Sequence, residues 1–451
     1  MKRDDIIRVH IDRLNTDGTG HAVADGRELS VKGALPGDTV DVRILSVRRY
    51  TARVKSETIL SPEVERILPE CPHFSYCGGC RWQDVPYDVQ CRMKGDLVKA
   101  ALADIPGIEP IERIDVVPSP DVFFYRNKME FSFDSPPSAQ GKVFLGLHEA
   151  GKYDKVFDLK DCRLQSELSN RAVEVTHAFV REQKHSAYGL KSHEGLLRFL
   201  VVRDGKNTGD LMLNLVTSGE DFKTAADYSE RIVRDIPGVT TVMRSINSGK
   251  GSVAVGEKHE ILFGDGLIRE RIGEYTFTIS PDSFFQTNPR QTENLYNTIR
   301  DFSGLTGREN LLDLYCGTGT IGIYLAGKAK TVTGVENVES CIADARRNAE
   351  INNVSNIKFL SGQVEKVIGE SMGAFDVVVC DPPRAGLHPK ALNKLLRMRI
   401  ARMVYVSCNI KAMPHDLEML AMAGYRVKDV RAFDMSPHTP YIETVILLEI
   451  W

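Results

Sequence analysis

The residues that most clearly could take part in a reaction follow two apolar runs near the C-terminus. Cys408 comes directly after Met403–Ser407. A cysteine at the tip of a central strand, facing the crevice where such sheets bind ligands, is a poor choice for packing alone. Asp381 follows the run Phe375–Cys380, and the two prolines after it cannot continue a strand, so its carboxylate is presented at the same edge. Cys408 is therefore predicted to be a nucleophile. The other cysteines of this half are predicted to be structural: Cys316, Cys341 and Cys380.

A glycine turn precedes both runs in the chain. Leu311–Leu314 is an apolar strand that leads into Tyr315-Cys-Gly-Thr-Gly-Thr-Ile-Gly322 and a helix, so a ligand can approach the backbone at the helix N-terminus. Glu336 follows at about 20 residues, the spacing at which a carboxylate binds ribose hydroxyls in dinucleotide-binding folds. NAD and S-adenosylmethionine both carry such a ribose, so the turn alone does not choose between them.

A second group of reactive side chains lies in the first half of the chain. Cys71, Cys77 and Cys80 are separated by five and two residues, and two glycines let the last two cysteines reach one centre. Cys162 is the best placed fourth ligand, and Cys91, on an expected helix, is the reserve. Four thiolates suit a 4Fe-4S cluster or tetrahedral zinc. The first gap of five residues argues against a radical S-adenosylmethionine enzyme, whose three cysteines are spaced three and two.

The composition indicates what class of protein carries these groups. The chain has 451 residues, 42% hydrophobic and 26% charged, which excludes wholesale disorder and suggests about three domains. No apolar run approaches the 18 residues of a membrane span, and no secretory signal follows the first methionine, so a cytoplasmic location is expected. The formal net charge of −3 gives no global sign of a polyanionic partner, and any nucleic-acid surface must be local.

The pattern of turns and runs divides the chain into three parts. Residues 1–60 read as short antiparallel strands of a small OB-like barrel, residues 61–275 as a mixed α+β domain that carries the cysteines, and residues 276–451 as a doubly wound α/β sheet. The expected helix over 87–105 is a candidate to pack on the last domain. In the barrel, the stretch Arg43–Lys55 holds five cations and no acid. It could follow a phosphate backbone, or be a solvated strand edge with protective charges.

The residues now described resemble known families. The barrel, especially Gly33-Ala-Leu-Pro-Gly-Asp38, resembles the RNA-binding TRAM domain. The whole chain resembles the RNA uracil-5-methyltransferases that use S-adenosylmethionine and carry a 4Fe-4S cluster. In the last domain the matching motifs are Ser283-Phe-Phe-Gln-Thr-Asn-Pro289, Asp313-Leu-Tyr-Cys-Gly-Thr-Gly319, Asp381-Pro-Pro-Arg384, Ser407-Cys-Asn409 and His438-Thr-Pro-Tyr-Ile-Glu-Thr444.

This resemblance implies a Rossmann-like methyltransferase fold and a role for each matched residue. Cys408 would be the nucleophile and Glu443 the base that removes a proton. Thr320 and Gln363 are matched by spacing alone. The implied cofactor contacts are Gln286, Tyr315, Thr320, Glu336, Gln363 and Asp381, and the implied cluster ligands are Cys71, Cys77, Cys80 and Cys162.

The expected activity is methylation of carbon 5 of a uridine in RNA by a monomeric enzyme. The cysteine cluster favours 23S ribosomal RNA, because transfer-RNA members in many bacteria lack it. An NAD-linked oxidoreductase would have no use for Cys408 or the barrel, and a cytosine-5 methyltransferase usually places proline where Ser407 stands. A non-catalytic RNA-binding or assembly factor would have little reason to keep both Cys408 and Glu443. The nucleophile must act as a thiolate, which the field of the strand-to-helix turn is expected to favour.

Overall fold

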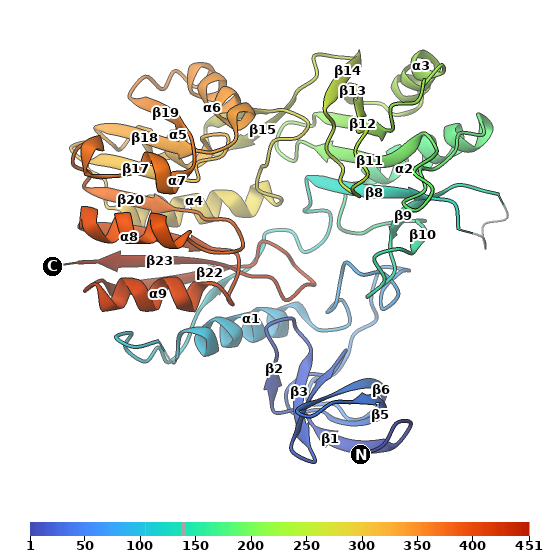
Figure 1. Cartoon of the computed structure of the whole chain (residues 1–451), viewed down its shortest axis with the longest axis horizontal. Helices are drawn as coiled ribbons and strands as arrows, with labels where there is room; N and C mark the ends of the chain where they lie inside the picture. The colour runs from blue at the N-terminus through green and yellow to red at the C-terminus, as the bar shows by residue number, and fades with distance from the viewer. Residues whose placement is uncertain (104, 137–140, 451) are drawn as a thin grey trace.

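The computed structural model describes residues 1–103, 105–136 and 141–450, which contain three large β-sheets and a two-stranded one. Figure 1 shows the N-terminal barrel in blue below the other two sheets, with the C-terminal sheet in orange and red to one side and the middle sheet in green to the other. None of the helices in the described ranges is long and apolar enough to cross a membrane.

The N-terminal barrel has six strands in the order β1-β5-β6-β4-β3-β2. Alternate side chains, among them Val9, Val40 and Val42, point into a small apolar core. The expectation of purely antiparallel pairing is wrong at one place, because β4 runs parallel to β6, the two being joined through the long strand β5. The strands are β1 (Ile6–His10), β2 (Arg13–Leu14), β3 (Gly20–Ala24), β4 (Arg27–Val31), β5 (Thr39–Val47) and β6 (Thr51–Ser61).

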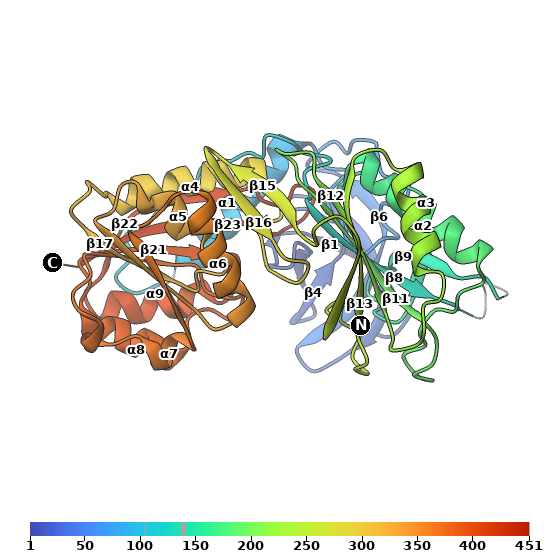
Figure 2. The same ribbon diagram turned by 90° about the horizontal axis from the view of Figure 1, so that it is seen from above.

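The middle sheet has seven strands in the order β10-β9-β8-β11-β12-β13-β14. Every residue of β12 is buried, as expected for a central strand covered on both faces. Helices α2 (Glu167–Glu182) and α3 (Ala225–Asp235) lie side by side against this sheet (Figure 2). The strands are β8 (Lys128–Asp134), β9 (Phe144–His148), β10 (Val156–Asp158), β11 (Leu197–Asp204), β12 (Leu211–Thr217), β13 (Val239–Ile246) and β14 (Lys258–Phe263).

The C-terminal sheet has eight strands in the order β19-β18-β17-β20-β21-β23-β22-β7. The five from β19 to β21 are parallel, as the pattern predicts, whereas β23 is inserted antiparallel between β21 and β22. The strands are β7 (Val116–Val117), β17 (Asn310–Leu314), β18 (Thr331–Glu336), β19 (Ile357–Ser361), β20 (Val377–Cys380), β21 (Arg402–Ser407), β22 (Arg426–Phe433) and β23 (Glu443–Glu449).

Helices cover both faces of this sheet and form two apolar cores. One core contains α4 (Pro289–Ser303), α5 (Thr320–Ala326) and α6 (Glu339–Ile351), and the other contains α7 (Val364–Val367), α8 (Pro389–Met398) and α9 (Met413–Met422). A short 3-10 turn spans Glu370–Met372. The hairpin of β15 (Ile268–Ile272) and β16 (Tyr275–Ile279) lies between the two large sheets (Figure 2) and shares the first core with Met212 and Met243 of the middle sheet.

Helix α1 (Tyr87–Leu102) and strand β7 come early in the chain but pack on the C-terminal sheet. The helix buries Val89, Met93 and Leu97 in the core that also holds α8 and α9. It ends earlier than the expected limit of 105, and residue 104 lies outside the described residues. The division of the chain at residues 60 and 275 stays a prediction.

Candidate active site

The glycine turn after β17 and the acid that ends β18 meet at the carboxyl edge of the sheet. Tyr315, Gly317 and Gly319 all have positive φ, at 61°, 53° and 79°. The turn thereby aims the Gly317 N–H at the Glu336 carboxylate, which accepts it at 3.1 Å. The other Glu336 oxygen accepts the N–H groups of Asn337 and Val338 at 2.7 and 2.8 Å. Four backbone and carboxylate groups thus form a rigid polar edge.

The remaining predicted cofactor contacts are arranged around this edge. Thr320 begins α5, and its hydroxyl lies 2.7 Å from the hydroxyl of buried Tyr296 on α4. Gln286 lies in the loop after β16, where its backbone carbonyl accepts the Asn127 side-chain N–H at 2.9 Å. Gln363 follows β19 and is exposed. Gln363 is therefore the member of the set with the least support from its surroundings.

Cys408 opens into a cavity of about 220 Å³ at the end of β21. The pKa of its thiol is raised to about 11, mainly by burial and also by the negative charges of Glu443 and Asp381, whereas Arg384 lowers it. The expected thiolate-favouring field is therefore outweighed by burial and two carboxylates. The cavity is lined by Thr16, Asp17, Arg81, Arg384, Cys408, Asn409, Ile410, Lys411, Pro440, Tyr441 and Ile442.

Glu443 is the first residue of β23 and is only 7% exposed. Its neighbour Thr444 pairs with Ser407 of β21, which brings the carboxylate beside Cys408. Burial raises the pKa of Glu443 well above its ordinary value, and Asp381 raises it further, whereas Arg384 lowers it. Burial also raises the pKa of Asp381. Two carboxyl groups, a thiol and one guanidinium therefore share a small, poorly solvated space.

Arg384 is held at the mouth of this space by its neighbours. Its guanidinium lies 5.0 Å above the centre of the Tyr441 ring, and its carbonyl accepts the Asn409 side-chain N–H at 2.7 Å. None of the ion pairs among the described residues includes Arg384, Arg81 or Lys411. Three cations thus surround the opening above Cys408. Without forming such an ion pair, Arg81 and Lys411 lower the pKa of Asp17 and Arg384 lowers that of Glu443.

The barrel contributes one wall of the Cys408 cavity. Its turn between β2 and β3 contains Thr16 and Asp17, and the Arg81 guanidinium donates to the Asp17 carbonyl. Gly18 has a φ of 80°, and a Cβ there would lie 2.7 Å from the Cβ of Pro440. The Trp82 indole N–H donates to the Gly18 carbonyl at 3.3 Å. Only glycine allows this close approach of the barrel to the loop that contains Pro440.

The four cysteines of the first half surround one cavity of about 660 Å³. Burial raises the pKa of Cys80 to about 12, with further contributions from the other three thiols, so the four groups are near neighbours. Within the described ranges, no three cysteine, histidine or acidic side chains are close enough to ligate one metal ion. The reserve residue Cys91 lies elsewhere, on α1 at a separate cavity with Tyr87.

Two aromatic side chains connect this cysteine cavity to the loop that carries Gln286. Phe284 and Phe285 both line the cavity. Phe285 is buried against Phe277, with the ring centres 6.0 Å apart, whereas Phe284 is 63% exposed. Phe284 is therefore the one of the pair whose ring is accessible from solvent.

Comparisons with known proteins agree with this arrangement. Residues 252–450 match the family model described as tRNA (Uracil-5-)-methyltransferase, and residues 3–55 match the TRAM domain. An uncharacterised RNA methyltransferase of Chlorobaculum tepidum is 38% identical, over 99% of this chain and 97% of its own. The chain belongs to the RNA uracil-5-methyltransferase family. It is an S-adenosylmethionine-dependent enzyme, which confirms the predicted activity, fold class and methyl donor.

Two further relatives extend over the whole methyltransferase. A second uncharacterised RNA methyltransferase, from Caldanaerobacter subterraneus subsp. tengcongensis, is 36% identical over all of both chains. The crystal structure of the Pyrococcus abyssi tRNA (uracil-54, C5)-methyltransferase in complex with S-adenosyl-L-homocysteine is 32% identical, with a TM-score of 0.78. It matches 98% of this chain and 100% of that chain.

Several residues of the methyltransferase site were not anticipated from the sequence. Tyr296 contacts Thr320 from α4, and Asp17 and Arg81 reach the nucleophile cavity from the barrel side. Tyr296 occupies a helical position at ordinary apolar spacing, so nothing in its surroundings distinguishes it from a core residue. Arg81 and Trp82 directly follow Cys80, and their sequence carries no signal that this segment turns toward Cys408.

Proposed function

We propose that this methyltransferase acts through a covalent bond between the Cys408 sulfur and carbon 6 of the target uracil. The observation that carries the proposal is the position of Cys408 and Glu443 at the ends of the paired strands β21 and β23, where the Glu443 carboxylate acts on the Cys408 thiol. Carbon 5 of uracil is too weakly nucleophilic to accept a methyl group unaided. Thiolate addition at carbon 6 converts the ring to an enolate whose carbon 5 is nucleophilic.

Glu443 acts after the methyl group has been transferred. Carbon 5 then carries both a methyl group and a proton, and the carboxylate accepts that proton. The electron pair of the C5–H bond re-forms the double bond between carbons 5 and 6, the C6–S bond breaks, and Cys408 leaves as a thiolate. A buried carboxyl with a raised pKa is a stronger base once ionised, which suits this step.

Bound S-adenosylmethionine supplies the methyl group, and the carboxyl edge of the sheet has the features to hold it. The Glu336 carboxylate would accept ribose hydroxyls, and apart from its chain neighbours no described heavy atom lies within 4 Å of the position that a Cβ on Gly317 would take. The turn therefore leaves open space in front of its backbone. We assign the binding of the donor to Gln286, Tyr315, Thr320, Glu336, Gln363 and Asp381.

For the RNA, we propose 23S ribosomal RNA as the substrate, on the strength of the cysteine cavity beside the active site. Transfer RNA is the second candidate, because the Pyrococcus abyssi relative is a tRNA (uracil-54, C5)-methyltransferase. The test is to incubate the purified enzyme with a methyl-labelled donor and with each RNA, both taken from cells that lack its gene. 5-Methyluridine in the ribosomal RNA alone supports the first candidate, and labelling of transfer RNA alone overturns it.

We further propose that Cys71, Cys77, Cys80 and Cys162 hold a 4Fe-4S cluster. An iron–sulfur cube is larger than a single ion, so its four thiolates stand further apart than around zinc, whose sulfurs all lie about 2.3 Å from the metal. The four cysteines line one cavity of about 660 Å³, which has room for a centre larger than a single ion. All four iron positions would then be filled by cysteine, which gives the cluster a structural role.

Protein purified without oxygen should be brown and contain about four irons and four sulfides per chain. Cys162→Ser should lower this iron content, because it removes one of the ligands. Cys91→Ser is the matched control and should leave it unchanged, since Cys91 lies at a separate cavity. Iron and sulfide analysis checks both variants, and one zinc per chain without iron would contradict the proposal.

The structure makes fewer cations of the run Arg43–Lys55 available to RNA than the sequence suggests. Arg43 binds Glu57 at 2.8 Å, so it is neutralised within the barrel. Arg48 and Arg53 line a groove of about 630 Å³, and none of the ion pairs among the described residues includes either. Asp17 lines both this groove and the Cys408 cavity, so the two lie next to each other. We propose that RNA follows this path to the nucleophile.

Replacing Arg48 and Arg53 together with alanine should weaken RNA binding and lower the slope of log affinity against log salt by about 1 per cation. The slope falls because fewer phosphate contacts release fewer counterions. The matched control is the double variant Lys328→Ala and Lys330→Ala, which removes two exposed cations at the opposite edge of the C-terminal sheet. Titrations of RNA binding at several salt concentrations check this, and equal slopes for the two double variants would exclude the barrel groove.

A further inference from the structure

The loop that connects β22 to β23 carries wall residues of the nucleophile cavity and ends at Glu443. We call Asp434–Ile442 the strap. We propose that Lys94 and Gln90, on helix α1, are positioning residues that hold the strap so that Glu443 reaches the proton at carbon 5. This inference rests on the proposed function of Glu443 and adds two residues that lie far from the reacting atoms in the sequence.

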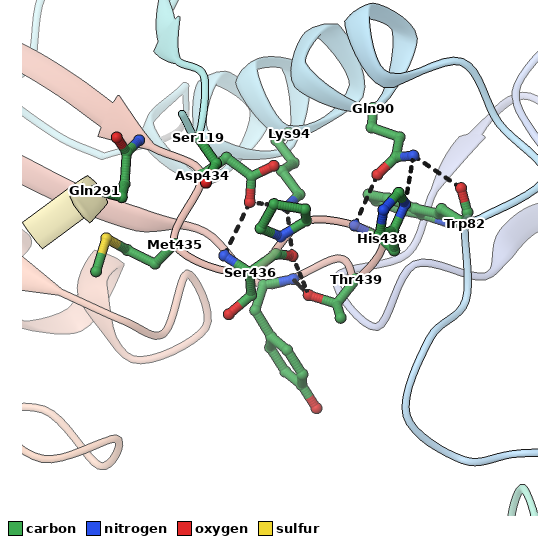
Figure 3. Close-up of polar contacts among 12 residues, drawn as sticks. Trp82, Gln90, Lys94, Ser119, Gln291, Asp434, Met435, Ser436, His438 and Thr439 are labelled. Carbon is green, nitrogen blue, oxygen red and sulfur yellow. Dashed lines mark hydrogen bonds and ion pairs between the residues drawn. The ribbon is translucent and has the colours of Figure 1, made fainter. Parts of the chain in front are cut away.

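The first attachment is an ion pair between α1 and the start of the strap (Figure 3). The Lys94 ammonium lies 2.5 Å from an oxygen of Asp434, and both side chains are 0% exposed. The same ammonium donates to the Ser436 carbonyl at 3.0 Å, and the same Asp434 oxygen accepts the Ser436 N–H at 3.0 Å. Both ends of the pair are therefore bound to the strap backbone as well as to each other.

The second attachment is one turn earlier on the same helix. The Gln90 side-chain carbonyl accepts the His438 backbone N–H at 2.9 Å, and its amide group lies 3.2 Å from the His438 ring nitrogen Nδ1. The same amide donates to the Trp82 and Val85 carbonyls at 2.9 Å. Figure 3 shows Gln90 between the strap and the segment that contains Trp82. One buried side chain thus ties the strap to the barrel side of the molecule.

The strap needs such attachments because its own conformation is unfavourable. His438 has a φ of 66°, a left-handed conformation that a side chain other than glycine rarely adopts. It persists only where the surroundings over-determine it. Further along the strap, Pro440, Tyr441 and Ile442 line the Cys408 cavity, and Glu443 comes directly after Ile442. Any rotation of the strap therefore moves the base relative to the nucleophile.

The chemistry of the Lys94–Asp434 ion pair indicates that it fixes the geometry of the strap rather than stabilising the fold. A fully buried ion pair loses the hydration of both charges, and apolar side chains of similar volume are often as stabilising or more. A charged pair, however, fixes direction and distance, which apolar contacts do not. The orientation of Glu443 is what this fixed geometry would secure.

The experiment compares the double variant Lys94→Met/Asp434→Leu with wild type and with Gln90→Ala. The double variant leaves no unpaired buried charge, so it should fold, and its thermal unfolding midpoint verifies this. We expect kcat to fall about 10- to 100-fold in each variant, with little change in the KM for S-adenosylmethionine. RNA carrying the labelled methyl group should accumulate on Cys408, because attack and methylation proceed while proton removal is slowed. Arg92→Met, at an exposed ion pair on the same helix, is the matched control and should behave as wild type.

A merely structural role predicts a different result. In that case turnover and adduct fall together, in proportion to the folded fraction, and this outcome overturns the inference, as does wild-type turnover. The variant Glu443→Gln separates the inference from the proposed function. If it accumulates the methylated adduct and the strap variants do not, the positioning role is wrong while the role of Glu443 stands. If Glu443→Gln accumulates no adduct, the proposed function itself fails.

Discussion

Cys408→Ala should form no covalent complex with RNA and should lose methyl transfer by on the order of 10⁶-fold, as enzymes do on losing a covalent nucleophile. Without the sulfur no enolate forms, so carbon 5 never becomes nucleophilic. The measurements are transfer of labelled methyl groups to RNA and a denaturing gel for the adduct. RNA containing 5-fluorouridine at the target should trap the wild-type enzyme, since fluorine cannot leave as a proton does. Methylation by Cys408→Ala at a measurable fraction of the wild-type rate would disprove the covalent mechanism.

The acidity of the thiol adds a pH dependence to this result. Because the pKa of Cys408 is raised to about 11, the thiolate is the minor form at neutral pH and its fraction grows about tenfold per unit below that pKa. Formation of the fluorouridine adduct should therefore accelerate between pH 7 and pH 9. A flat profile over this range would show that bound RNA lowers the pKa of the thiol.

Glu443→Gln should permit attack and methylation but block proton removal, which lowers turnover by about 10²- to 10⁴-fold. RNA would remain attached to Cys408, survive denaturing electrophoresis and carry the label of the methyl donor. The amide keeps the size of the carboxylate and cannot accept the proton, so the block is chemical rather than steric. Glu418→Gln, on the exposed face of α9, removes a carboxylate of the same kind and should turn over normally. Wild-type turnover by Glu443→Gln would show that another base acts, reached through water.

The parts of the site that lie on single apolar runs were predictable from the sequence. Asp381 and Cys408 follow strands that end in prolines or polar residues, and both lie at the carboxyl edge. The burial of Glu443 was not predictable from the sequence, because it depends on the insertion of β23 between β21 and β22. A local pattern describes a strand but does not say which neighbours it will have.

Pairings between distant segments were beyond sequence reasoning for the same reason. Gln90 and His438 lie 348 residues apart, and only the packing of α1 on the C-terminal sheet brings them together. The raised pKa of Cys408 likewise depends on which carboxylates fold around it, so the expectation of a low pKa failed. The cation run of the barrel was visible in the sequence. The ion pair between Arg43 and Glu57 was not, because it depends on the register of β5 and β6.

The packing of α1 on the last strands has a consequence for synthesis on the ribosome. Lys94 and Asp434 are separated by 340 residues, so at about 5 to 20 residues per second the helix waits roughly 20 to 70 s for its partner. During that interval the apolar side of α1 and the single buried lysine have no sheet to cover them. The middle sheet can fold meanwhile, because its seven strands lie between residues 128 and 263. The catalytic half is therefore the last to be completed, and a truncated chain that lacks β22 and β23 leaves an early helix exposed to proteases and chaperones.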